Sequence, residues 1–230
     1  MFNKTMGEFG RMYEDEEKSI QNDGRDLLKT NHSILCFILI STLLIFTGCT
    51  NNGNKDSIAT ISVNSDSEHT NTFKKLNIGE LYDFDFKLNE ADKMWVNVWM
   101  ERYKDGKKEP QPIAELSYGN SPNKVEEGNV GFGMINTGDT RLGFLYAPNV
   151  TSTPQNIDKI HSDHVISGWD YAVGEDKKEI KLGETYLLGA YRESNGNSMR
   201  TYNLQDDNEV KKMICDDKIV FLLKMKIEEK

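Results

Sequence analysis

Short runs of alternating apolar and polar residues, separated by turn residues, fill the chain from Phe73 to its C-terminus. In the clearest run, MWVNVWMERY, the alternation predicts a strand with two sets of side chains, with Met94, Val96, Val98 and Met100 on one side and Trp95, Asn97, Trp99 and Glu101 on the other. Similar runs recur every 10–15 residues or so, which is typical of an all-β fold. We therefore expect an antiparallel β-sandwich, immunoglobulin-like or similar.

Turn residues punctuate these runs. Asp105-Gly106 directly follows the clearest run and is a strong signal for a tight hairpin turn. The glycines of GNVGFGMIN lack the spacing of a dinucleotide-binding loop and indicate a bulge or a close crossing of strands.

One short helix is predicted near the C-terminus, in the segment DDNEVKKMI. Asp206 can cap its N-terminus, and Glu209 stands three residues further on. Lys211 and Lys212 lie toward its end, where positive charge favours the helix dipole.

A different pattern precedes the domain. From Ile34 to Phe46, thirteen residues are apolar except Ser41 and Thr42. A helix needs about 20 apolar residues to cross a bilayer, whereas the apolar part of an export signal needs only about 7–15. The run is therefore interpreted as an export signal.

The sequence Phe46-Thr47-Gly48-Cys49 resembles the lipobox of bacterial lipoprotein signals, although Phe46 stands where that pattern prefers leucine. The resemblance implies that residues 34–48 form the apolar region and cleavage site, and that Cys49 becomes the lipid-modified first residue. The alternative is an uncleaved signal anchor in which Cys36 and Cys49 are ordinary apolar side chains. Both interpretations place the C-terminal part outside the cytoplasm, at a membrane.

The N-terminal segment, residues 1–33, does not fit a signal because it is long and acidic, whereas export signals begin with a short basic stretch. One explanation is that translation starts at Leu27 or Leu28 from a non-standard initiation codon. The other is a genuine cytoplasmic segment, which a signal anchor would retain.

Residues 49–71 are rich in Asn, Ser, Thr and Asp and are expected to form a flexible tether, with IATISV as a lone hint of a strand. Residues 72–230 are then the extracytoplasmic β domain. Besides Cys49, Cys215 is the sole cysteine of this mature part, so a disulfide framework is excluded and Cys215 is expected to be a small buried residue.

Composition limits the partners. Of 28 basic and 37 acidic residues, five and seven precede Cys49, so the mature part carries a net charge near −7. Such a surface repels nucleic acid and anionic lipid headgroups. The expected partners are the membrane, through the lipid anchor, and an envelope protein or cell-wall ligand.

Two sets of side chains are candidate sites. Trp95, Asn97 and Trp99 share one face of a strand and could stack on a sugar ring or a peptide, as could Trp169; packing under a second layer is the alternative. The cluster His161, Asp163 and His164 could bind a divalent metal ion, or could simply be a polar loop.

The run MWVNVWMERYKDGK, with ELSYG, GFGMIN and FLYAP after it, resembles the extracytoplasmic tails of some antirepressor metallopeptidase sensors of Gram-positive bacteria. The zinc-binding helical motif of those proteins is missing, so the resemblance implies an outer module without the protease. We expect a non-enzymatic binding or sensing module of the cell envelope that needs no cofactor. The alternatives are a metal-dependent envelope enzyme using His161, Asp163 and His164, and a carbohydrate or peptide binder using Trp95 and Trp99.

Overall fold

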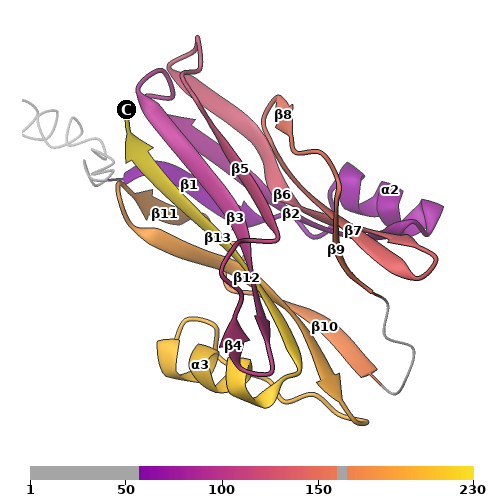
Figure 1. Cartoon of the computed structure of the whole chain (residues 1–230). Coiled ribbons are helices and arrows are strands. Elements are labelled where there is room, and N and C mark those ends of the chain that lie inside the picture. The colour runs from indigo at the N-terminus through magenta and orange to yellow at the C-terminus, as the bar shows by residue number, and fades with distance from the viewer. Residues whose placement is uncertain (1–56, 160–164) are drawn as a thin grey trace, which may run out of the picture. The chain divides into compact units, whose positions relative to one another are not determined.

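A computed structural model describes residues 57–159 and 165–230, which belong to one compact unit, Gly53–Lys230. Two antiparallel sheets pack face to face in this unit (Figure 1). The predicted all-β sandwich is thereby confirmed.

Sheet A has seven strands in the order β11-β1-β2-β6-β7-β8, with β9 also paired to β7. Its strands in chain order are β1 (Ser57–Val63), β2 (Gly79–Asn89), β6 (Val125–Thr137), β7 (Thr140–Ala147), β8 (Val150–Thr151), β9 (Gln155–Lys159) and β11 (Lys178–Lys181).

Sheet B has six strands in the order β10-β12-β13-β3-β4, with β5 also paired to β3. Its strands in chain order are β3 (Met94–Lys104), β4 (Lys107–Lys108), β5 (Ala114–Gly119), β10 (Val165–Tyr171), β12 (Thr185–Asn195) and β13 (Ile219–Glu229).

Alternation along each strand builds the core between the sheets. On β3 the predicted inward set is almost completely buried, while Trp95 on the opposite side is 36% exposed. Facing this set from sheet A are Phe84, Phe86 and Phe132, each at most 2% exposed. The side-chain pattern that predicted β3 therefore has a direct physical cause in the burial of one face.

The predicted turn at Asp105-Gly106 joins β3 to β4, with Lys104 paired to Lys107. Both turn residues have positive φ, 48° and 76°, which is the backbone that a two-residue hairpin with the correct twist needs.

Two helices flank the sheets. The predicted C-terminal helix, α3 (Asp207–Asp216), is confirmed, and Asp206 caps it by accepting a hydrogen bond from the Asn208 N–H at 2.8 Å. The sequence did not predict the second helix, α2 (Glu68–Leu76), which lies beside β2 and β7 (Figure 1). Cys215, expected to be buried, is instead exposed because it lies on the outer side of α3.

The expected tether over 49–71 is wrong for its second half. β1 lies between β11 and β2 in sheet A, with Ile61 opposite both Lys178 and Phe86. Ala59 and Ile61 are buried in the core, which explains why this polar stretch is held in the domain. The ordered β domain begins at least as early as Ser57, not at residue 72.

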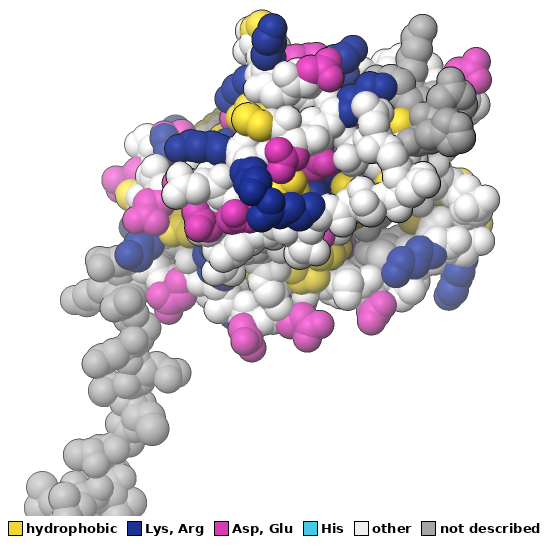
Figure 2. All heavy atoms as spheres, turned by 90° about the horizontal axis from the view of Figure 1, so that it is seen from below, with side chains coloured by type: hydrophobic (Ala, Val, Ile, Leu, Met, Phe, Trp, Pro, Cys, Tyr) yellow, Lys and Arg dark blue, Asp and Glu magenta, His cyan; other side chains and the backbone are white. Residues whose placement is uncertain are grey.

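Positive and negative side chains are interspersed on the face that carries α3 (Figure 2). Within the described residues, no helix is both long enough and apolar enough to cross a membrane.

Candidate functional site

An open cleft of about 750 Å³ lies between α2 and the outer face of sheet A. Side chains and backbone from α2 and from strands β2, β6, β7 and β8 border it: Glu68, His69, Thr72, Phe73, Leu81, Glu127, Gly128, Asn129, Phe144, Tyr146, Ala147, Pro148, Asn149, Val150 and Thr151. Its volume falls in the range of sites for small organic ligands.

Local interactions fix α2 as one wall of this cleft. The Ser67 hydroxyl accepts a hydrogen bond from the Thr70 N–H at 3.0 Å and so caps the N-terminus of α2. Asn77 adopts the left-handed conformation (φ 49°) and ends the helix, as is common at this position. Lys74 and Lys75 occupy the last turn, where they oppose the negative end of the helix dipole.

A histidine and a buried aspartate face each other beneath α2. Asp83 lies on the side of β2 away from the core, and its side chain is completely buried. Its Oδ1 accepts a hydrogen bond from the Phe84 N–H at 3.0 Å, whereas its Oδ2 has no hydrogen-bond partner among the described residues. The nearest basic group is the half-exposed His69, whose Nδ1 is 3.5 Å from Oδ2. A buried carboxylate with an unsatisfied oxygen is costly to stability and is often retained for function.

Tyr146 completes this group. Its hydroxyl donates to the Tyr82 carbonyl oxygen at 3.3 Å, and its ring meets the His69 ring edge to face at 6.0 Å. Burial raises the pKa of Tyr146, and the negative charge of Asp83 raises it further, so the phenol stays protonated at neutral pH.

Aromatic rings continue the wall on either side. Phe144 lies between Phe73 and Tyr146, with ring centroids 6.1 Å away in each case. Gly131 and Gly133 of β6 make room for these rings, since a Cβ on Gly131 would lie 2.3 Å from the Tyr146 hydroxyl and one on Gly133 would lie 2.3 Å from the Phe144 ring. The sequence predicts a bulge or a close crossing of strands here; β6 instead pairs in regular register with β2 and β7, and the glycines give space to aromatic rings.

Acidic and amide groups also line the rim of the cleft. Glu68 belongs to the first turn of α2, and Glu127 of β6 pairs with Lys87 of β2. The Asn129 amide donates to Asp85 Oδ1 at 3.4 Å, which leaves its carbonyl oxygen as an acceptor.

The structure places Trp95, Asn97 and Trp99 together on the outward face of β3, away from the cleft. The Trp95 indole covers Gly119, the residue opposite it on β5, because a Cβ there would lie 2.4 Å from the ring. The Asn97 amide donates to Glu228 at 3.1 Å and accepts from the Ser117 hydroxyl at 2.7 Å. Covering a strand glycine with an aromatic ring stabilises the sheet, so Trp95 has a structural role whether or not it binds a ligand.

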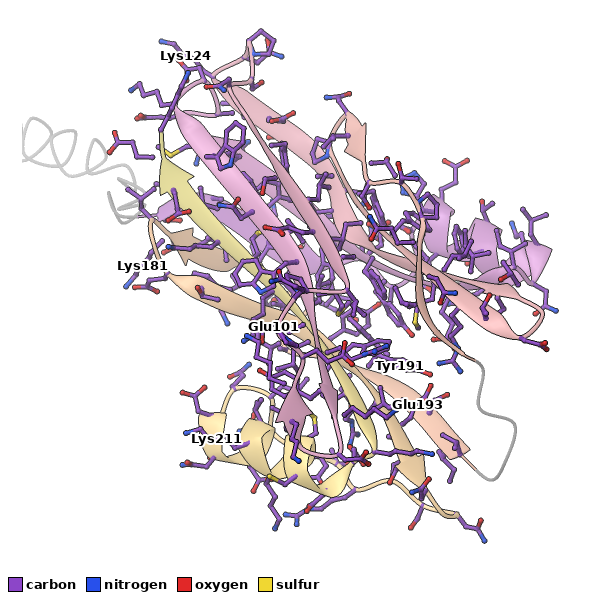
Figure 3. All side chains as sticks on the ribbon, in the orientation of Figure 1. Glu101, Lys124, Lys181, Tyr191, Glu193 and Lys211 are labelled. Atoms are coloured by element: carbon purple, nitrogen blue, oxygen red, sulfur yellow. The ribbon has the colours of Figure 1, made fainter. Side chains whose placement is uncertain are left out.

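Trp99 belongs to a polar network centred on Glu101, which is labelled in Figure 3. The carboxylate accepts hydrogen bonds from Lys108, Lys224, Trp99 and Tyr103 at 2.7–3.2 Å. Burial alone would raise the pKa of Glu101, but these hydrogen bonds outweigh burial and lower the pKa to about 2. The Trp99 indole is therefore held in place by a permanently charged partner.

Trp169 is separate from the other two tryptophans. It stacks on Tyr82 between the sheets, with centroids 3.7 Å apart, and covers Gly189 of β12. Trp169 is partly buried against the core, which is the position expected if it packs under a second layer instead of stacking on a ligand.

Cys49, His161, Asp163 and His164 lie outside the described residues. In the described part of the chain, no group of three or more His, Cys, Asp or Glu side chains could hold a metal ion.

The cleft was not predicted from the sequence, since the first four residues of its wall α2, residues 68–71, belong to the segment interpreted as a tether and no helix was expected there. Two signals were available there. Ser67 followed by Glu68 is typical of a helix start, because serine caps the N-terminus and an acidic residue favours the first turn. Lys74 and Lys75 followed by Asn77 are typical of a helix end.

These features define the class: an antiparallel two-sheet β-sandwich with a helix-bordered cleft on one outer face. Residues 76–227 match the model of the YgaN domain family, and the chain belongs to that family. The match runs from the last residue of α2 through β13, so β1 and most of α2 lie outside it. No curated protein and no solved structure matched the chain.

Proposed function

We propose that this protein is a lipid-anchored, extracytoplasmic binding or sensing module of the cell envelope, without catalysis of its own, and that the α2 cleft is its ligand site. The observation that carries the binding role is the cleft itself, which combines an aromatic wall, His69 paired with the buried Asp83 behind it, and a volume suited to a small organic ligand.

The side chains around the cleft favour binding over catalysis. The described residues that border it include no serine or cysteine, and neither of its threonines, Thr72 and Thr151, has a side-chain hydrogen bond to a base that could activate it. The pair of His69 and Asp83 joins α2 to β2 at the cleft, and we infer that it recognises a charged or hydrogen-bonding group of the ligand.

The proposed anchor is short. Seven residues separate Cys49 from Ser57, where β1 begins, so the lipid-bearing cysteine lies within about 29 Å of the domain even at full extension. A lipidated cysteine carries at least two chains, which is enough for stable anchoring. We therefore expect the module to work close to the membrane surface.

The anchor is tested by changing Cys49. The full chain, expressed in bacteria with labelled palmitate, should incorporate the label and lose residues 1–48, whereas Cys49→Ala should remain unlabelled. Cys215→Ala is the matched control and should keep the label. A wild-type protein that retains residues 1–48 and carries no label would show that the anchor does not exist.

A second candidate function has one observation in its favour. Trp95 is exposed on one side while Gly119 lies beneath the other, so its ring is available to stack on a sugar or peptide. Quenching of tryptophan emission by cell-wall fragments, lost in Trp95→Ala, would favour this face over the α2 cleft.

A further inference from the structure

We infer that the α2 cleft selects a positively charged amine carried on an apolar body. This inference rests on the proposed binding role of the cleft and specifies the chemical class of its ligand.

Charge is the first argument. The acidic side chains bordering the described cleft are Glu68 and Glu127; the one basic side chain there is His69, which pairs with Asp83, and neither lysine nor arginine borders it. Lys87 and Lys177 lie in the adjoining hollow with Asp85, where Lys87 pairs with Glu127. Glu68 has no such basic partner in the described structure, so its charge is available at the cleft.

Asp83 is the second argument and is independent of the rim. It lies two residues along β2 from Leu81, a residue of the cleft wall, so the alternation of the strand directs both side chains to the same face. Its side chain is fully buried, and its Oδ2 lies 3.5 Å from His69 Nδ1, so the carboxylate offsets any positive charge on that imidazole and the pair adds no net positive charge to the cleft. A charge that is screened little by water acts over a longer distance than an exposed one, so Asp83 favours a cation in the neighbouring cleft.

The aromatic wall is the third argument. Phe73, Phe144 and Tyr146 present their rings to the same space. Such rings supply apolar contact for an organic body and attract a cation placed over a ring face.

The N-terminus of α2 is the feature that could instead favour an anion. Ser67 already caps it, and Glu68 supplies a negative charge in its first turn. The helix end therefore does not reverse the preference for a cation.

The test compares three probes of similar size that differ in charge: 2-phenylethylammonium, 2-phenylethanol and 3-phenylpropanoate. Each is titrated into the ¹⁵N-labelled full chain at pH 7 and low salt, and binding is followed by the amide signals of α2 and β7. The ammonium probe should bind at least tenfold more tightly than the alcohol, and the carboxylate should bind most weakly.

Substitutions at Asp83 and Glu68 test whether these two carboxylates cause the preference for a cation. Asp83→Asn and Glu68→Gln should each weaken the ammonium probe about fivefold and leave the alcohol unchanged. Glu115→Gln removes the same charge from an exposed site on β5 and should have no effect. Glu68 is exposed, so its variant remains informative even if Asp83→Asn fails to fold.

Two outcomes overturn the inference and are distinguishable. If the alcohol or the carboxylate binds at the cleft as tightly as the ammonium probe, the charge preference is wrong while the cleft remains a binding site. If none of the probes shifts the signals of the cleft, both the charge preference and the proposed binding site fail.

Discussion

Replacing Arg141 with methionine should lower the free energy of unfolding by about 3–5 kcal/mol, because it removes a guanidinium that pairs with the buried carboxylate of Glu193. Arg141 of β7 donates from Nη1 to the Tyr191 hydroxyl at 2.7 Å and to Glu193 Oε1. Both partners lie on β12, where Figure 3 labels them, and the Glu193 side chain is 1% exposed. The guanidinium also lies over the Tyr191 ring, 5.5 Å from its centroid. This cluster is a polar connection between the two sheets.

Equilibrium unfolding in urea, followed by circular dichroism, measures the effect. The double variant Arg141→Met, Glu193→Leu should recover a large part of the loss, because the buried carboxylate is then removed together with the guanidinium that paired with it. Arg200→Met is the matched control: Arg200 pairs with Glu209 at 3.7 Å in an exposed position, and its loss should cost less than about 1 kcal/mol. A cost at Arg141 no larger than that at Arg200 would show that the inter-sheet pair contributes little.

Gly131→Ala is expected to have the second largest effect, a loss of about 3 kcal/mol together with a disrupted cleft. An added Cβ would lie 2.1 Å from the Tyr82 carbonyl oxygen and 2.3 Å from the Tyr146 hydroxyl. The carbonyl belongs to the paired strand β2 and cannot turn away, so Tyr146 or the strand itself must move.

Gly168→Ala is the control for this substitution. Gly168 also lies within a strand, β10, but its added Cβ would meet only Met199 Sδ at 3.7 Å, which is ordinary contact. The control should unfold at the wild-type urea concentration or slightly above it, since glycine weakens strands. Equal stability of the two variants would mean that β6 tolerates a side chain at residue 131 and that Tyr146 is not held as described.

The sequence predicts those parts of the fold in which one physical cause acts locally. The alternation in β3 reflects burial of one face, and the turn at Asp105-Gly106 reflects the positive φ that its hairpin requires. Asp206 predicts the start of α3 because its side chain accepts a hydrogen bond from the backbone N–H of Asn208, two residues away in the same segment.

The missed elements depend on partners far along the chain. β1 has two core residues, Ala59 and Ile61, and it is held because it fills the space between β11 and β2. α2 is mostly polar and gains its place by covering the outer face of β2. Neither effect is visible in a short window of sequence.

The candidate sites show the same limit. Alternation correctly places Trp95, Asn97 and Trp99 on one face, but their hydrogen bonds and the glycine beneath Trp95 are set by β5 and β13. The pairing of His69 with Asp83 joins a helix to a strand that no sequence pattern connects. Chemistry assembled from separate elements therefore required the structure.

The central claim is that the domain binds its ligand in the cleft beneath α2. The most direct test is to map a set of small organic fragments, with cationic, neutral and anionic members, onto the full chain by amide and side-chain NMR shifts. The fragments that bind should shift Phe73, Phe144 and Tyr146 and leave Trp95 and Trp99 unchanged. Fragments that gather at Trp95 and Trp99, with the cleft signals unmoved, would contradict the claim.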